Sequence, residues 1–301
     1  MDGEYRMVTS TPSIPTEEAP MPAPRAIPWV PIAWFALLLI VCYAPILQRL
    51  VNQWISDEDM GHGFFVPAVA GYVAWQRRQE LLAASPKPSI WGLALILFAA
   101  FQMILATLGA ELFLARTAFI ESLVGAILFL RGWQALKILG FPLFLLVFMV
   151  PIPSILYSRI TFPLQIFASR VAEFSLSLIG IPVLRDGNVL ELASQKLSVV
   201  EACSGIRSLL SLTFLSLIYA YFFDSKLWMR AFMLCATIPI AIVANASRVT
   251  ITGILSEINK EYASGVYHSL SGWVVFMVAF VLMVLVHQIT NRVYGWKHGK
   301  Q

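Results

Sequence analysis

Cys203, Arg248 and His268 carry the side chains of this sequence that are best suited to chemistry with a cysteine nucleophile. Cys203 lies where a polar, turn-rich segment gives way to a long apolar run ending near Phe223, so it begins a predicted membrane helix. Backbone N–H groups at a helix N-terminus are unpaired and carry partial positive charge, which favours the thiolate, the nucleophilic form. A histidine can transfer protons near neutral pH, and a guanidinium can stabilise a thiolate or an oxyanion.

Each of these residues also has a purely structural interpretation. Cys203 could be a small buried residue, as most free cysteines are, and His268 could simply cap its helix. Arg248 could extend to lipid headgroups, the commoner fate of a single interfacial arginine. His62, between two glycines, could pack a loop, and Arg207, one turn into the predicted helix, could be structural or help to position a substrate.

The composition limits the class of protein and its ligands. Of the 301 residues, 58% are hydrophobic and 13% are charged, which is about half the charge content of a soluble protein. The net charge of +4 does not indicate nucleic-acid binding, because basic residues collect at the cytoplasmic ends of membrane helices and no RNA- or DNA-binding motif is present. One thiol and two histidines from separate loops lack the ligand spacing of a zinc site, so neither a metal nor another cofactor is expected.

The elements that position these residues are predicted from apolar runs of about 20 residues. Eight runs predict membrane helices, of which the second, fourth and fifth are short: Trp29–Leu47, Phe64–Trp75, Trp91–Gly109, Thr117–Leu130, Ile138–Pro151, Ser204–Phe223, Leu227–Ala244 and Ser269–Thr290. The segment Tyr157–Leu178 mixes apolar and charged residues, which predicts an amphipathic helix in the outer interface. Asp186-Gly187 between apolar residues predicts a β-hairpin outside the membrane. The expected fold is an all-α polytopic membrane protein of about eight transmembrane helices, with an outer interfacial helix and a short periplasmic β-hairpin.

Three regions follow from this pattern. Residues 1–28 are rich in Pro, Ser, Thr and Glu and predict a flexible cytoplasmic tail. Residues 29–291 form the predicted membrane domain, and residues 292–301 a basic cytoplasmic tail.

Basic residues in the short loops predict the orientation. With eight crossings they share one face with both termini, which should be cytoplasmic: Arg77, Arg78, Lys87, Arg131, Lys137, Lys226, Arg230, Arg292, Lys297 and Lys300. Cys203, Arg248 and His268 then fall on the opposite face, together with His62. The sequence therefore predicts a multi-pass protein of the inner membrane whose site faces the periplasm.

Four motifs resemble those of one known family. The segment Glu201–Leu209 resembles the signature of the exosortases, bacterial membrane transpeptidases related to archaeosortases. Asn245–Val249 and Tyr267–Gly272 resemble the Arg and His motifs of that family in order and spacing, and Asp59–Gly63 resembles its early loop motif. The resemblance covers residues 30–290, nearly all of the membrane region, and it assigns residues 29–291 to an exosortase-like transmembrane domain.

The resemblance implies that Cys203 is the nucleophile and that Arg248 and His268 are its catalytic partners. Substrates of the family are exported proteins whose C-terminal signal has a Pro-Glu-Pro-like motif (PEP motif), one membrane helix and a basic tail. The enzyme would cleave near the motif through a thioester on Cys203 and transfer the product to a surface acceptor, in association with exopolysaccharide production. Membrane lipids are the other expected partners. Further residues of these motifs are expected to contact the substrate: His62, Glu201, Ser204, Arg207 and Asn245.

Two alternatives remain from the residues alone. A non-enzymatic transporter or polysaccharide-export partner would place ionisable groups near the middle of the bilayer and break its helices there, whereas here the candidates cluster at one end. A hydrolase would use the same nucleophile with water as the acyl acceptor. The sequence does not distinguish transfer from hydrolysis.

Overall fold

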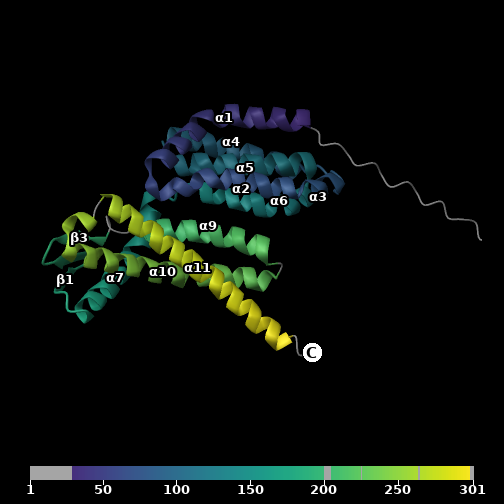
Figure 1. Cartoon of the computed structure of the whole chain (residues 1–301). Coiled ribbons are helices and arrows are strands. Elements are labelled where there is room, and N and C mark those ends of the chain that lie inside the picture. The colour runs from purple at the N-terminus through teal and green to yellow at the C-terminus, as the bar shows by residue number, and fades with distance from the viewer. Residues whose placement is uncertain (1–28, 200–204, 225, 264, 299–301) are drawn as a thin grey trace, which may run out of the picture.

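The helices form two groups that lie side by side in the computed structural model, which describes residues 29–199, 205–224, 226–263 and 265–298 (Figure 1). The first group runs from α1 to α6 and the second from α7 to α11, with α9 next to the first group. A small sheet lies at one end of the second group.

The first group consists of antiparallel apolar helices joined by short connections. Its elements are α1 (Trp29–Ser56), the 3-10 helix η1 (Glu58–Phe64), α2 (Phe65–Gln76), α3 (Arg78–Ala83), α4 (Ile90–Leu108), α5 (Leu112–Arg131), α6 (Trp133–Leu145) and the 3-10 helix η2 (Leu146–Met149). Helices α4 and α5 approach closely because Gly92 has no side chain: a Cβ there would lie 2.2 Å from the backbone nitrogen of Phe129. Such close approach at small residues is how helices associate in membranes.

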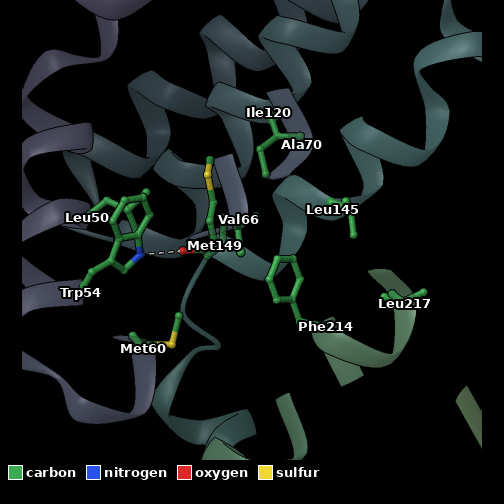
Figure 2. Packing of buried hydrophobic residues seen from close by; sticks show 11 residues of the cluster. Leu50, Trp54, Met60, Val66, Ala70, Ile120, Leu145, Met149, Phe214 and Leu217 are labelled. Carbon is green, nitrogen blue, oxygen red and sulfur yellow. Dashed lines mark hydrogen bonds between the residues drawn. The ribbon is translucent and has the colours of Figure 1, made fainter. Parts of the chain in front are cut away.

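A buried apolar cluster joins the first group to α9. Figure 2 shows Trp54 of α1, Val66 of α2 and Phe214 of α9 in this cluster, with the indole Nε1–H of Trp54 donating a hydrogen bond to the carbonyl of Met149 at 3.0 Å. The indole therefore buries its ring while its one polar atom keeps a partner. This contact fixes the end of α1 against η2.

The second group, in its described residues, combines four α-helices with a three-stranded sheet. Its elements are α7 (Ser154–Leu178), β1 (Val183–Asp186), β2 (Val189–Leu192), β3 (Lys196–Ser198), α9 (Gly205–Phe223), α10 (Leu227–Ile258), the 3-10 helix η3 (Lys260–Ala263) and α11 (Gly265–His298). The predicted hairpin is confirmed: β1 pairs antiparallel with β2, and Gly187 takes the positive φ of +60° that the turn requires. Strand β3, which was not predicted, extends the sheet. Leu190, Leu192 and Leu197 pack the sheet onto α7 and α10.

The count of eight membrane spans is not confirmed. All eight predicted runs coincide with helices, but five described helices are long and apolar enough to cross a membrane, or six if one bent pair forms a single span. The physical reason is length: α2 has 12 residues, which at about 1.5 Å per residue reach about 18 Å of a hydrocarbon core about 30 Å thick. The bent pair is Trp133–Met149 with Ser154–Leu178, whose axes differ by 84°. The segment predicted to lie in the interface is thus a separate helix turned sharply from the one before it.

Candidate active site

Around Cys203, the structure describes the candidate site from the start of α9 onward. Cys203, Glu201 and Ser204 lie outside the described residues. Gly205 begins α9, and Arg207 lies in its first turn. Cys42 of α1 and Cys235 of α10 lie exposed on the outer surfaces of their helices, so neither takes part in the packed interior.

Arg248 lies in α10 with its side chain packed against α11. The residue is only 8% exposed, and a Cβ built at Gly272 would lie 2.9 Å from both Cζ and Nη2 of Arg248. The guanidinium therefore occupies the space that any larger residue at position 272 would fill. This contact does not fit an arginine extended toward lipid headgroups.

His268 lies near the start of α11, one turn before the residue that Arg248 packs against. It precedes Gly272 by four residues within α11, which is about one helical turn. The motifs that carry Arg248 and His268 are therefore brought together by the packing of α11 on α10.

The position of Asn245 shows which part of α10 lies beside the start of α9. It is buried and lines a small hollow with Leu209 of α9 and Leu164 of α7. Because α9 and α10 are antiparallel, Gly205, one turn before Leu209, lies opposite residues one turn beyond Asn245, which is where Arg248 lies. The segment that follows Cys203 in the chain thus begins at the level of Arg248.

Arg248 lies far from the connection between α9 and α10. Twenty-one residue steps separate it from Leu227, the first residue of α10, which at about 1.5 Å per step is about 32 Å. A hydrocarbon core is about 30 Å thick. Arg248 therefore lies about one membrane thickness from the basic residues Lys226 and Arg230, as expected for a site at one membrane face.

His62 binds to α9 and η2. Its Nε2 lies 3.2 Å from the carbonyl oxygen of Phe148, and its Nδ1 lies 3.4 Å from Oγ of Ser211. A carbonyl only accepts, so Nε2 carries the proton and Ser211 donates to Nδ1 in the neutral ring. Ser211 is six residues beyond Gly205 on α9, about 9 Å along the axis. These bonds favour a role for His62 in packing η1 against α9.

An apolar groove runs beside the contact between Arg248 and Gly272. It has a volume of about 330 Å³ and lies between α10, η3 and α11. Ile251, Leu255 and Val274 contribute to its lining, with Tyr262 and Tyr267, whose rings are tilted by 58° with their centroids 4.8 Å apart. An apolar segment could therefore lie next to the guanidinium.

The arrangement can stabilise negative charge in a site shielded from water. A buried guanidinium offers several fixed N–H donors, and a developing oxyanion gains most from such donors where the dielectric constant is low. Within the described part of the chain, no three His, Cys, Asp or Glu side chains are grouped closely enough to hold a metal ion.

Two further sets of ionisable residues were not found from the sequence. Asp224 and His287 form a buried hydrogen bond of 3.2 Å, although 63 positions separate them and no motif marks either. In α5, Nε of Arg116 and Oε2 of Glu121 are buried without a hydrogen-bond partner among the described residues. An ionisable group inside an apolar helix, as at His287, Arg116 and Glu121, is the signal that could have found one member or more of each set.

A comparison with protein families identifies one relationship. The family model described as "Transmembrane exosortase (Exosortase_EpsH)" matches residues 54–285, from the last residues of α1 to the greater part of α11, and this range contains all four motifs. Neither a curated protein sequence nor a solved structure matches the chain.

Proposed function

Because this chain belongs to the transmembrane exosortase family, we propose that it is a membrane-embedded cysteine transpeptidase or protease that cleaves C-terminal sorting signals of exported proteins. One observation carries the proposal: the guanidinium of Arg248 lies against Gly272, one turn from His268, at the level where α9 begins. Cys203 precedes Gly205 by two residues in the chain. The proposal therefore takes its three chemical groups from the segment before α9, from α10 and from the start of α11.

In the proposed first step, the Cys203 thiolate attacks the carbonyl carbon of the scissile peptide bond. The C–S bond forms as the carbonyl oxygen becomes an oxyanion, whose charge Arg248 stabilises. The oxyanion then collapses, the C–N bond breaks, and protonated His268 donates a proton to the leaving amine. The products are a thioester on Cys203 and a released C-terminal fragment.

In the proposed second step, an acceptor amine, hydroxyl or water attacks the thioester. His268, now neutral, takes the proton of the acceptor, and the Cys203 thiolate leaves. Arg248 acts in both steps as a charge stabiliser, because a guanidinium remains protonated and is a poor proton donor at neutral pH.

The substrate proposed from the family is an exported protein whose signal contains a PEP motif, a membrane helix and a basic tail. The apolar groove beside Arg248 supports this, because the membrane helix of such a signal needs an apolar surface next to the cleavage point. We place the site at the outer face of the inner membrane, where exported proteins emerge. The continuous course of α5 past Arg116 and Glu121 differs from the broken helices at which transporters bind their substrates.

Co-expression with a reporter protein that carries such a signal tests the proposal. Wild-type enzyme should yield a reporter with a new C-terminus near the PEP motif, measured by mass spectrometry. Cys203→Ala and Cys203→Ser should abolish cleavage at normal abundance, because a serine hydroxyl is a much weaker nucleophile without a dedicated base. Cys42→Ala and Cys235→Ala are matched controls on exposed helix surfaces and should cleave normally.

The mass of the new C-terminus separates transfer from hydrolysis. A free carboxylate identifies a hydrolase, and an added mass identifies an acceptor. Full cleavage by both Cys203 variants, in cells without another exosortase, would exclude the nucleophile and favour the non-enzymatic alternative.

A further inference from the structure

A buried chain of hydrogen bonds joins Tyr219, His287 and Asp224 at the end of the second group away from Arg248. The Tyr219 hydroxyl lies 3.1 Å from Nδ1 of His287, and Nε2 of His287 lies 3.2 Å from a carboxylate oxygen of Asp224. The side chains of His287 and Asp224 are 7% and 5% exposed. None of these residues takes part in the proposed reaction.

The donors and acceptors of this chain fit together. A carboxylate only accepts, so Nε2–H of His287 donates to Asp224, and in the neutral ring Nδ1 accepts from the Tyr219 hydroxyl. The other oxygen of Asp224 accepts the backbone N–H of Lys226 at 2.7 Å. Burial alone would raise the pKa of Asp224, but the bond from Lys226 and the contact with His287 outweigh burial and lower it. Asp224 is therefore a carboxylate whose two oxygens both accept a hydrogen bond.

The surrounding residues extend this network across helices. Arg230 of α10 donates to the backbone carbonyls of Asp224 at 2.8 Å and Tyr221 at 3.3 Å. Arg77, beyond the end of α2, donates to the Tyr221 hydroxyl at 2.8 Å. Lys226 donates to Asn291 of α11 at 3.4 Å. Residues from both helix groups thus meet at this end of the bundle.

Helix α11 packs on its neighbours along one face, where Phe276, Phe280 and Val284 lie partly buried against one apolar cluster. Ala279, Met283 and His287 are its buried residues among those described, and they lie four apart on one face. Most of its other large side chains are exposed: Tyr267, Leu270, Trp273, Val274, Met277, Val278, Val281, Leu282, Leu285, Ile289 and Val293. Apolar contacts along one face are not directional, whereas the two hydrogen bonds of His287 fix one rotation and one height of α11.

We infer that Asp224 and His287 are positioning residues that fix the rotation and height of α11, and through it the placement of His268 and Gly272 against Arg248. His287 and His268 are 19 residues apart on one continuous helix, about 28 Å at about 1.5 Å per residue. A rigid helix transmits a rotation or a slide at His287 to the site at its other end. This inference rests on the proposed function of Cys203, Arg248 and His268.

Kinetics of the full-length enzyme in lipid vesicles, with the reporter as substrate, test the inference. His287→Leu removes both hydrogen bonds and should lower kcat about tenfold to hundredfold with little change in KM, the loss expected when reacting groups shift by about 1 Å. His287→Gln can still donate to Asp224 and should restore most of the rate. Gln288→Leu is the matched control, because Gln288 is the exposed neighbour on the same helix, and it should react at the wild-type rate.

A distance measurement separates positioning from a general loss of stability. Spin labels at positions 258 and 273, in protein lacking the three native cysteines, report the separation of the outer ends of α10 and α11. The distance distribution should shift or broaden in His287→Leu and return in His287→Gln. If His287→Leu does not accumulate, Asp224→Asn replaces it, with the same expected change in kcat and distance.

The outcomes distinguish this inference from the proposed function. Unchanged kcat and distances in His287→Leu or Asp224→Asn overturn the positioning role while leaving a Cys203-dependent enzyme in place. Normal cleavage by Cys203→Ala overturns both.

Discussion

The guanidinium of Arg248 and the backbone of Gly272 are in direct contact, and a Cβ at position 272 would lie 2.9 Å from Cζ and Nη2. In Gly272→Ala the added methyl group must displace this guanidinium, because the backbone of α11 leaves it no other space. We expect processing to fall at least about tenfold, since a misplacement of about 1 Å can cost about a hundredfold in rate. Cleavage of the reporter, relative to enzyme abundance, measures the effect.

Gly140→Ala is the control for this prediction, because a Cβ at that helical glycine meets nothing within 4 Å. It should process normally. Equal processing by Gly272→Ala and wild type would show that the position of Arg248 does not matter for the reaction.

Arg248→Lys retains the charge but loses the planar set of N–H donors. We predict a large loss of processing, about 10²-fold or more, the usual effect of removing an oxyanion donor, with normal membrane insertion. Arg170→Lys is the matched control, because Arg170 is exposed on α7. Wild-type rates for both Arg248→Lys and His268→Ala would contradict the assignment of the site.

The carboxylate of Asp224 predicts how stability depends on pH. Its pKa is lower in the folded protein than in the unfolded chain, so its contribution is complete above the unfolded pKa, about 3.9, and is lost as the pH falls through the folded value. The melting temperature of wild type should exceed that of Asp224→Asn above about pH 5, and the difference should shrink below about pH 4. A difference that stays constant down to pH 3 would contradict the lowered pKa.

Close packing of α4 on α5 predicts a loss of stability in Gly92→Ala. A Cβ at this position would lie 2.2 Å from the backbone nitrogen of Phe129, and backbone cannot rotate away as a side chain can. We expect destabilisation of about 1–3 kcal/mol, as for other overpacked sites, measured by thermal unfolding in detergent. Gly71→Ala, where a Cβ meets nothing within 4 Å, should melt within about 1 °C of wild type or slightly above it.

Labelling of single cysteines from outside the cell tests the orientation. The strand β1 and the connection between α9 and α10 lie at opposite ends of the second group (Figure 1), so position 185 and position 226 should face opposite sides of the membrane. We expect an impermeant thiol reagent to label outer positions 57, 185 and 260, and to leave inner positions 78, 137, 226 and 300 unlabelled in intact cells. Labelling of position 226 but not 185 would show that the topology is the reverse of the predicted one and that the site does not face the periplasm.

The sequence predicted local features well where one short pattern determines them. Asp186-Gly187 between apolar residues was enough for the hairpin, because the turn needs a residue that tolerates positive φ. Each of the eight apolar runs coincides with a helix, but hydropathy does not determine where a helix ends, so α2 proved too short to span alone and α10 continues 14 residues beyond its predicted end at Ala244 to Ile258. Strand β3 has three residues, too few for an alternating pattern to stand out.

For segments far apart in the chain, the sequence predicted only that they lie at the same face of the membrane. The motifs around Arg248 and His268 were expected at one face, and the contact of Arg248 with Gly272 brings them together. The bond between Asp224 and His287 depends on how α11 crosses the connection between α9 and α10. The spacing of residues within a single helix does not predict where that helix crosses another segment.

Because α10 is long, the rate of the proposed reaction should depend on the thickness of the bilayer. Arg248 lies about 32 Å from the start of a helix that is 32 residues and about 48 Å long, while hydrocarbon cores vary by several ångströms between membranes. A thin bilayer leaves the buried guanidinium at the level of the headgroups, where water around the protein weakens its field. A thick one draws it into hydrocarbon, where helix tilt must compensate. Lipid chain length should therefore set an optimum for turnover without any change in the protein.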